Sequence, residues 1–159
     1  MKTQSNIEGN SAAGLANRAS SMRASVGTSA PGKQAVFKRR ILVVDDNVDA
    51  GDTLALLLKL KGHDVSLARD GLEAVDIASE FRPEVILMDI GMPHLNGYDA
   101  TRRIRETEHG RAMFIVALTG WGQPTDIACS EEAGCSAHLV KPVDFAALDQ
   151  LLAKPTSVK

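Results

Sequence analysis

The chain has 159 residues, 44% of them hydrophobic, and a formal net charge of −2 at pH 7. This length and composition predict one globular domain with a single core. No apolar run is long enough to cross a bilayer and no secretory signal is visible, so we expect no membrane span and a cytoplasmic location. Two cysteines, Cys129 and Cys135, are too few for a disulfide framework and suit reduced thiols.

The charge is divided unevenly along the chain. Residues 1–40 hold seven Lys or Arg residues and one acidic residue, Glu8, whereas the remainder holds eleven basic and nineteen acidic residues. The basic segment is rich in Ser, Ala, Asn and Gly and has no sustained helical or strand period, so we expect residues 1–38 to be a disordered extension. An organelle transit peptide, or a patch that contacts nucleic acid or anionic lipid, stays open as an alternative for this segment.

From Arg40 onward, apolar strands alternate with amphipathic helices, which is typical of βα units in a parallel sheet. The first strand covers Ile41–Val44 and ends at two aspartates. The first helix follows over Val48–Leu60 and ends at Gly62. The second unit has a strand over Asp64–Ala68 and a helix over residues 72–78, capped by Asp70 and broken before Pro83.

The third strand, Val85–Met88, is a continuous apolar run, which indicates a strand buried on both faces. The remaining predicted elements follow in chain order: a helix over Tyr98–Glu106, a strand over Met113–Leu118, a helix over Thr125–Ala133, a strand over Ala137–Val140 and a helix over Phe145–Ala153. Because crossovers between parallel strands are right-handed, few windings of these five units are possible. We predict a flavodoxin-like (βα)5 α/β fold, doubly wound, with parallel strand order 2-1-3-4-5, over residues 39–153, followed by a short tail over 154–159.

Polar residues stand at the carboxyl ends of four predicted strands: Asp45 and Asp46 after the first, Asp89 after the third, Thr119 after the fourth and Lys141 after the fifth. The carboxyl ends of parallel strands form the crevice where ligands bind in open α/β sheets. Three carboxylates gathered there repel one another unless a cation holds them, and Mg²⁺ prefers such oxygen ligands. Because Mg²⁺ rarely fills its coordination sphere from protein alone, the cluster also implies a phosphoryl ligand.

With the metal in place, the roles of these residues separate. Asp89 would act as a nucleophile and form an acyl phosphate, while Mg²⁺ and Lys141 neutralise the charge that develops on the phosphoryl oxygens. Thr119 would offer a hydroxyl to the same oxygens. Each residue alone is equally typical of an ordinary polar loop, so the prediction rests on their joint occurrence.

The segments ILVVDDN, ILMDIGMPHLNGYDA, VALTG and HLVKPVD resemble the receiver domain of two-component response regulators, over about residues 38–153. The resemblance implies that Asp89 is the phospho-acceptor, and that Asp46, Asp89 and the backbone carbonyl of Gly91 bind Mg²⁺, for which Mn²⁺ can substitute. Asp45 would act through metal-bound water, Thr119 would be the switch hydroxyl, and Lys141 would bind the phosphate. A cis peptide between Lys141 and Pro142 is also implied.

Four further positions follow from the resemblance. The family often has Tyr or Phe where this chain has His138, so His138 is either a switch residue, which could respond to pH, or a surface residue without that role. Gly91 and Trp121 occupy positions that tune the lifetime of the phosphoryl group, although Trp121 could equally pack against its loop. His94 is expected to be exposed and to take no part in phosphotransfer.

Phosphorylation should shift the population of two arrangements of the fourth and fifth units, so the output surface is expected over residues 125–152. Only six residues follow Ala153, which indicates a stand-alone receiver or a piece of a longer protein, related to receivers of hybrid histidine kinases. The expected partners are a sensor histidine kinase or a histidine phosphotransfer protein, and a downstream protein that the sequence does not identify.

Three other functions fit the sequence less well. A phosphatase of the haloacid dehalogenase type also uses an Asp nucleophile and Mg²⁺, but its Asp-x-Asp motif after the first strand is missing, because this chain has Asp45, Asp46 and Asn47 there. A pseudo-receiver that only binds protein would be expected to lose an acidic residue or the lysine, and none is lost. Nucleic-acid binding by the basic extension is the weakest alternative.

Overall fold

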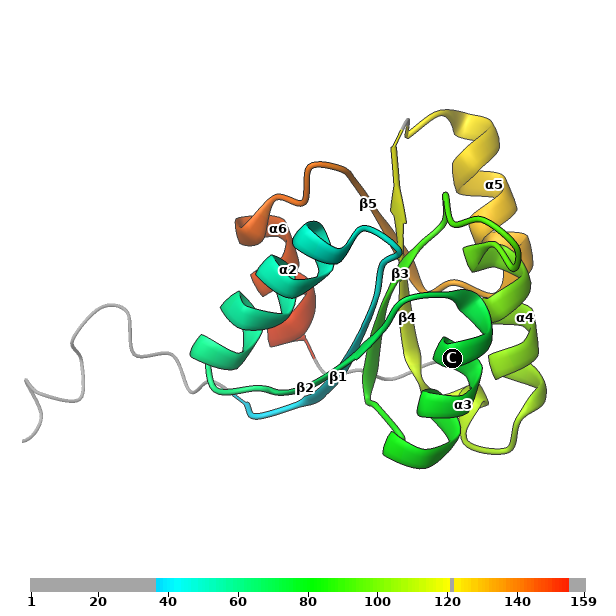
Figure 1. Ribbon diagram of the computed structural model, residues 1–159. Helices are drawn as coiled ribbons and strands as arrows, with labels where there is room; N and C mark the ends of the chain where they lie inside the picture. The colour runs from blue at the N-terminus through cyan, green and yellow to red at the C-terminus, as the bar shows by residue number, and fades with distance from the viewer. Residues whose placement is uncertain (1–36, 121, 155–159) are drawn as a thin grey trace, which may run out of the picture. The chain divides into compact units, whose positions relative to one another are not determined.

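The computed structural model describes residues 37–120 and 122–154. Its five strands form one parallel sheet in the order β2-β1-β3-β4-β5, which confirms the predicted fold (Figure 1). The strands are β1 (Arg40–Val44), β2 (Asp64–Ala68), β3 (Val85–Asp89), β4 (Phe114–Thr119) and β5 (Ala137–Val140).

Helices cover both faces of the sheet, as the doubly wound topology requires. They are α2 (Val48–Leu60), α3 (Gly71–Phe81), α4 (Gly97–Glu106), α5 (Pro124–Ala133) and α6 (Phe145–Ala153). Figure 1 shows α2 and α6 on one face and α3, α4 and α5 on the other. None of the described helices is long and apolar enough to cross a membrane.

Each face of the sheet has its own hydrophobic cluster, because successive strand residues point to opposite sides. Leu42, Ile86 and Ile115 belong to the cluster beneath α3 and α4, whereas Ile41 and Leu87 belong to the cluster beneath α2 and α6. All five of these side chains are fully buried. Strand β3 is buried along its whole length, as its continuous apolar sequence predicted.

Side chains cap the starts of four helices. The side chains of Asn47, Asp70, Asn96 and Asp144 accept hydrogen bonds from backbone N–H groups in the first turns of α2, α3, α4 and α6. These caps begin each helix soon after the preceding strand ends, which keeps the connecting loops short. The cap predicted at Asp70 is therefore confirmed, whereas Gln123, which precedes α5, forms no side-chain cap.

The predicted boundaries differ from the structure in small ways. Strand β3 continues through Asp89, and Met113 precedes β4 because its N–H closes a short 3-10 helix, η1 (Gly110–Ala112), that the sequence analysis did not predict. The predicted extension over residues 1–38 lies outside the described residues except for Phe37 and Lys38, and the tail is described only at Lys154.

Candidate functional site

A pocket of about 430 Å³ lies at the carboxyl edge of the sheet. Six of the predicted site residues line it: Asp45, Asp46, Asp89, Gly91, Thr119 and Lys141. They reach this edge from four different strands and the segments that follow them, which is the convergence that the strand-end pattern predicted. His138, the seventh, does not line the pocket.

The three aspartates form a compact acidic cluster. One carboxylate oxygen from each of Asp45, Asp46 and Asp89 lies within 4.8 Å of the others. Asp45 and Asp89 are brought together by the parallel pairing of β1 with β3, in which Val44 is opposite Met88. Asp46 is exposed, whereas the other two are 3% and 6% exposed. The cluster therefore has two buried members and one that faces solvent.

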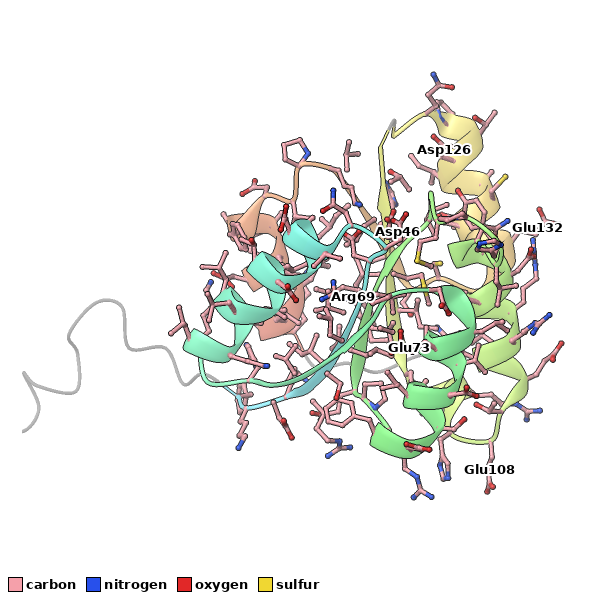
Figure 2. The ribbon with its side chains drawn as sticks, in the orientation of Figure 1. Asp46, Arg69, Glu73, Glu108, Asp126 and Glu132 are labelled. Atoms are coloured by element: carbon pink, nitrogen blue, oxygen red, sulfur yellow. The ribbon has the colours of Figure 1, made fainter. Side chains whose placement is uncertain are left out.

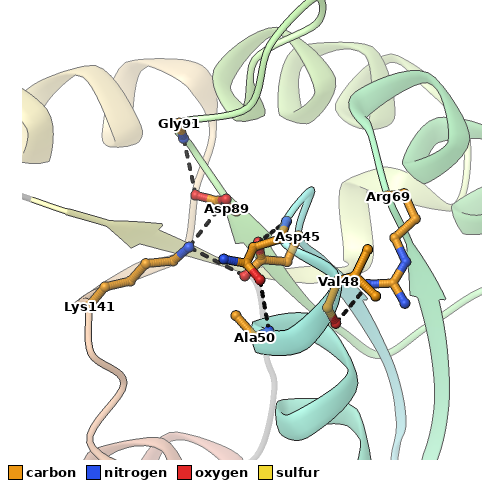
Figure 3. Close-up of polar contacts among 8 residues, drawn as sticks. Asp45, Val48, Ala50, Arg69, Asp89, Gly91 and Lys141 are labelled. Atoms are coloured by element: carbon orange, nitrogen blue, oxygen red, sulfur yellow. Dashed lines mark hydrogen bonds and ion pairs between the residues drawn. The ribbon is translucent and has the colours of Figure 1, made fainter.

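Lys141 is the basic residue among the described residues that line the pocket, and Figure 3 shows its side chain directed at Asp89 and Asp45. Its Nζ lies 3.3 Å from Asp45 Oδ2 and 3.2 Å from Asp89 Oδ2. The backbone N–H of Gly91 donates to the other oxygen of Asp89, at 3.1 Å. Burial alone would lower the pKa of Lys141, but the Asp89 and Asp45 carboxylates outweigh it and the pKa is raised. Lys141 is therefore held charged beside the acidic cluster.

The Asp89 carboxyl has a pKa above its ordinary value. The main cause is burial, which disfavours the charged form, and the charge of Asp45 acts in the same direction. Lys141 and the N–H of Gly91 oppose this shift without cancelling it. The positive groups of the protein therefore do not fully offset the negative charge of this cluster, and a cation bound among the aspartates would be favoured.

Thr119 lies at the end of β4, next to this charge. Its hydroxyl oxygen is buried and has no hydrogen-bond partner within residues 37–120 and 122–154. Its backbone carbonyl accepts a hydrogen bond of 2.7 Å from the N–H of Lys141. The end of β4 is therefore joined directly to the loop that follows β5. The peptide bond between Lys141 and Pro142 is cis, as the sequence analysis expected.

The other predicted positions are partly described. His138 is half-buried in β5 opposite Ala117, and strand alternation places it on the same face of the sheet as Thr119. His94 is exposed, as expected, with a backbone φ of 68°. Trp121 lies outside the described residues, so its predicted role stays a prediction.

Among the pocket residues that the sequence did not predict, two come from helices. Tyr98 in α4 and Asp126 in α5 line the pocket, and Figure 2 shows Asp126 on the first turns of α5, at the end of the domain where Asp46 lies. They enter from helices, so a search restricted to strand ends does not find them. The signal available was the position of Tyr98 directly after Gly97, at the start of the helix that follows the Asp89 loop.

The donor set suits Mg²⁺. Three carboxylates within 4.8 Å of one another supply hard oxygen ligands on one side of an open pocket, which leaves positions for water or a phosphoryl oxygen. No His or Cys belongs to this cluster, which disfavours a zinc site.

Comparison with known proteins decides the family. The model of the response regulator receiver domain matches residues 41–153. The chain belongs to this family. Receiver domains of response regulators act in two-component and phosphorelay signalling, and the receiver is a signalling domain.

Relatives in sequence include both short and long proteins. Protein PilH of Pseudomonas aeruginosa is 38% identical over 105 residues, which cover 66% of this chain and 87% of PilH. The CAI-1 autoinducer sensor kinase/phosphatase CqsS of Vibrio cholerae is 37% identical over 115 residues, which cover 72% of this chain and 17% of CqsS. The response regulator MprA of Mycobacterium is 36% identical, and this chain spans 48% of its length.

Two solved structures similar to this receiver contain a metal ion or a partner protein. The receiver domain of sensor histidine kinase PA1611 from Pseudomonas aeruginosa has a TM-score of 0.67 at 38% identity, and the match covers 73% of this chain and 95% of the PA1611 receiver. That structure holds a magnesium ion in its active site cleft. The receiver domain of Ssk1 from Saccharomyces cerevisiae, crystallised with the histidine phosphotransfer protein Ypd1, has a TM-score of 0.70 at 31% identity and covers 75% of this chain and 89% of its own.

Proposed function

We propose that this receiver accepts a phosphoryl group from phosphohistidine onto Asp89 in a Mg²⁺-dependent reaction and thereby controls the binding of a partner protein. One observation carries the proposal: Asp89 is a buried carboxylate paired with Lys141 and grouped with Asp45 and Asp46. Burial and the charge of Asp45 raise the pKa of Asp89, so a bound cation would relieve an unfavourable charge arrangement and offset the negative charge that a phosphoryl group brings.

The residues that would hold the metal are Asp46, Asp89 and the carbonyl of Gly91, with Asp45 acting through metal-bound water. Mg²⁺ would supply neutralisation of the charge on the phosphoryl oxygens. Mn²⁺ is expected to substitute, because it accepts the same carboxylate and carbonyl ligands. The magnesium ion in the related PA1611 receiver supports this assignment.

Phosphoryl transfer would then use this chain's own side chains as follows. An Asp89 carboxylate oxygen attacks phosphorus, and the new O–P bond forms as the P–N bond to the donor imidazole breaks, leaving its electron pair on the imidazole nitrogen. Lys141 Nζ donates to the transferred phosphoryl oxygens in place of part of its present contact with Asp89. The Thr119 hydroxyl, buried without a partner within the described residues, donates to another of these oxygens.

The same geometry favours signalling over turnover of a small substrate. The receiver would catalyse its own phosphorylation and the later hydrolysis of the acyl phosphate. A haloacid dehalogenase phosphatase would place its nucleophile after the first strand, whereas here the buried carboxylate paired with Lys141 follows the third. All the acidic and basic site residues that a protein-binding pseudo-receiver would be expected to lose are present in the pocket.

Partners are proposed on both sides of the reaction. A sensor histidine kinase or a histidine phosphotransfer protein would donate the phosphoryl group, and the co-crystal of Ypd1 with the Ssk1 receiver supports this kind of pairing. A downstream protein would bind the face formed by residues 125–152, where Val140 and Phe145 are 45% and 38% exposed. His138, on the same sheet face as Thr119, is proposed to act as the switch residue of β5.

Intact-protein mass after incubation with acetyl phosphate and Mg²⁺ tests the proposed function. Wild type should gain one phosphoryl group, and neither Asp89→Asn nor wild type in EDTA should gain it. Lack of any gain in wild type, both with acetyl phosphate and with a phosphorylated histidine phosphotransfer protein, would contradict the proposal and leave a receiver that works by binding alone.

A further inference from the structure

Helix α5 is attached to the domain much more firmly at its end than at its start. Its buried residues, Ser130 and Ala133, both lie in its second half. Beyond them, Arg105 of α4 donates from Nε to the carbonyl of Gly134 at 2.9 Å, and further hydrogen bonds from Arg105 reach Gly110 and Met113. The bond to Gly134 fixes the C-terminal end of α5 against α4, and the other two hold the Arg105 side chain in place.

The start of α5 lacks comparable support. Gln123 gives it no side-chain cap, unlike the residues that precede α2, α3, α4 and α6. Thr125 and Ala128 are exposed, and Asp126 and Ile127 are only half-buried. Neither burial nor capping therefore holds the first turn in place.

One side-chain hydrogen bond joins this turn to the neighbouring helix. The Tyr98 hydroxyl of α4 donates to the backbone carbonyl of Asp126 at 3.3 Å. Among the described residues it is the only side-chain hydrogen bond from another element to the first turn of α5. Tyr98 and Arg105 are seven residues apart, so both lie on the face of α4 that meets α5.

The start of α5 is also the part of the helix that is connected most directly to Thr119. Only residues 120–123 separate Thr119 from α5, so a shift of Thr119 toward a phosphoryl group on Asp89 pulls directly on the first turn. Tyr98 lines the same pocket as Asp89 and Thr119. A shift of the first turn of α5 away from α4 would therefore have to break the Tyr98 bond.

We propose that Tyr98 is a positioning residue whose hydroxyl holds the first turn of α5 in the unphosphorylated arrangement, and that this hydrogen bond is given up when Thr119 engages the phosphoryl group. Helix α5 then turns about its end at Gly134, which Arg105 keeps in place. This inference rests on the proposed function of Asp89 as acceptor.

Binding of beryllium fluoride with Mg²⁺, a non-covalent analogue of the phosphoryl group, tests the inference in wild type and Tyr98→Phe. Phenylalanine keeps the ring and removes only the hydroxyl that holds the resting arrangement. Its loss should therefore raise the affinity for the analogue roughly two- to tenfold, the effect of one net hydrogen bond. Trp121, the only tryptophan of the sequence, stands between Thr119 and α5 along the chain and serves as the fluorescence probe.

A matched control and a second measurement separate this role from a merely structural one. Ser79→Ala removes one hydroxyl bond to a helix carbonyl on α3, away from the pocket, and should leave the analogue affinity unchanged. Affinity for Mg²⁺ alone should be equal in all three proteins. Hydrogen exchange at residues 128–130 of unliganded Tyr98→Phe should be faster than in wild type, because the first turn of α5 opens more often.

Equal analogue affinity in wild type and Tyr98→Phe, or equal exchange at residues 128–130, would overturn the inference while leaving the proposed function intact. An equal gain in Ser79→Ala would also overturn it, because any loosening of the domain would then suffice. Failure of wild type to bind the analogue in the presence of Mg²⁺ would instead contradict the proposed function, and with it this inference.

Discussion

Thr119 shows at the scale of one residue how a site can be prepared for a group that arrives later. Its hydroxyl is buried beside Asp89 and Lys141 and finds no partner among the described residues. A buried hydroxyl without a hydrogen bond lowers stability, so the resting protein gains nothing from it. Its use lies in the phosphorylated state, where it can donate to a phosphoryl oxygen.

The substitution Thr119→Val separates these two states. Because valine replaces a hydroxyl that has no partner among the described residues with a methyl group of similar volume, the free energy of unfolding should stay equal or increase by up to about 1 kcal/mol. Affinity for beryllium fluoride should fall by roughly tenfold or more, since a charge-assisted hydrogen bond is lost. Urea unfolding and analogue titration measure the two quantities. Thr119→Ser, which keeps the hydroxyl, should retain most of the analogue affinity. A clear loss of stability in Thr119→Val would contradict the claim that the hydroxyl makes no stabilising hydrogen bond in the resting protein.

Residues at strand ends were predictable and residues on helices were not. Asp45, Asp89 and Thr119 meet in the pocket because a parallel sheet brings its carboxyl ends to one edge, which needs no knowledge of side-chain packing. Tyr98 and Asp126 reach the same pocket only through the rotation of α4 and α5 about their axes. That rotation is set by packing against the sheet, which sequence periodicity describes too coarsely.

At the scale of elements, the loop after Asp89 is packed so tightly that one position admits only glycine. A Cβ atom on Gly97, the first residue of α4, would lie 2.5 Å from the carbonyl oxygen of Asp89 and 2.9 Å from Ile90 Cα. Because backbone atoms on both sides cannot yield, helix α4 begins directly against the acceptor strand. The side chain of Asn96 caps the helix at this point.

The substitution Gly97→Ala should therefore disturb both stability and the site. We expect a loss of about 1–3 kcal/mol in the free energy of unfolding and a roughly ten- to hundredfold slower phosphorylation by acetyl phosphate. Gly62→Ala is the matched control: its φ of 98° makes alanine strained, but no atom lies within 4 Å of the new Cβ. This control should lose stability without losing phosphorylation. Equal rates in the two variants would mean that Gly97 does not position Asp89.

The elements themselves were largely predictable because most connections have a clear sequence signal. Asp70 caps α3 and Gly134 ends α5 with a φ of 103°, so both helix boundaries could be predicted to within a residue or so. The 3-10 helix η1 was missed because Gly110–Ala112 carries no hydrophobic period, and a side chain of α4, Arg105, donates to its Gly110 carbonyl. The match of the family to residues 41–153 covers all the predicted units.

At the scale of the whole domain, Arg39 and His63 join segments far apart in the sequence. The Arg39 guanidinium donates to the carbonyls of Leu152 and Lys154, both at 2.9 Å, at the end of α6. The backbone N–H of Arg39 donates to Nδ1 of His63, which follows α2. Since Nδ1 accepts this bond, His63 is neutral with its proton on Nε2. The first and last segments of the receiver are thus connected next to β1.

This arrangement predicts a loss of stability in acid. Burial, followed by the charge of Arg39, lowers the pKa of His63 below its ordinary value of 6.5. The unfolded chain therefore takes up a proton at a higher pH than the folded domain, so the stability that His63 contributes is complete above pH 6.5 and is lost as the pH falls through the folded pKa.

Urea unfolding at about pH 7.5 and about pH 5.5 measures this contribution. The control is His63→Asn, whose side-chain oxygen can accept the Arg39 N–H without titrating in this range. Its loss of stability between the two pH values should be smaller than that of wild type. Identical losses would show that other groups account for the acid sensitivity of the domain.

Reduction of the phosphorylated protein with borohydride, followed by mapping of the modified peptide, tests the assignment of Asp89 most directly. Borohydride converts an aspartyl phosphate to homoserine, so the acceptor keeps a permanent mark in the sequence. We predict homoserine at position 89 alone, in a reaction that needs acetyl phosphate and Mg²⁺. Homoserine at Asp45 or Asp46, or a phosphorylated protein without any homoserine, would contradict the assignment of Asp89 as the phosphoryl acceptor.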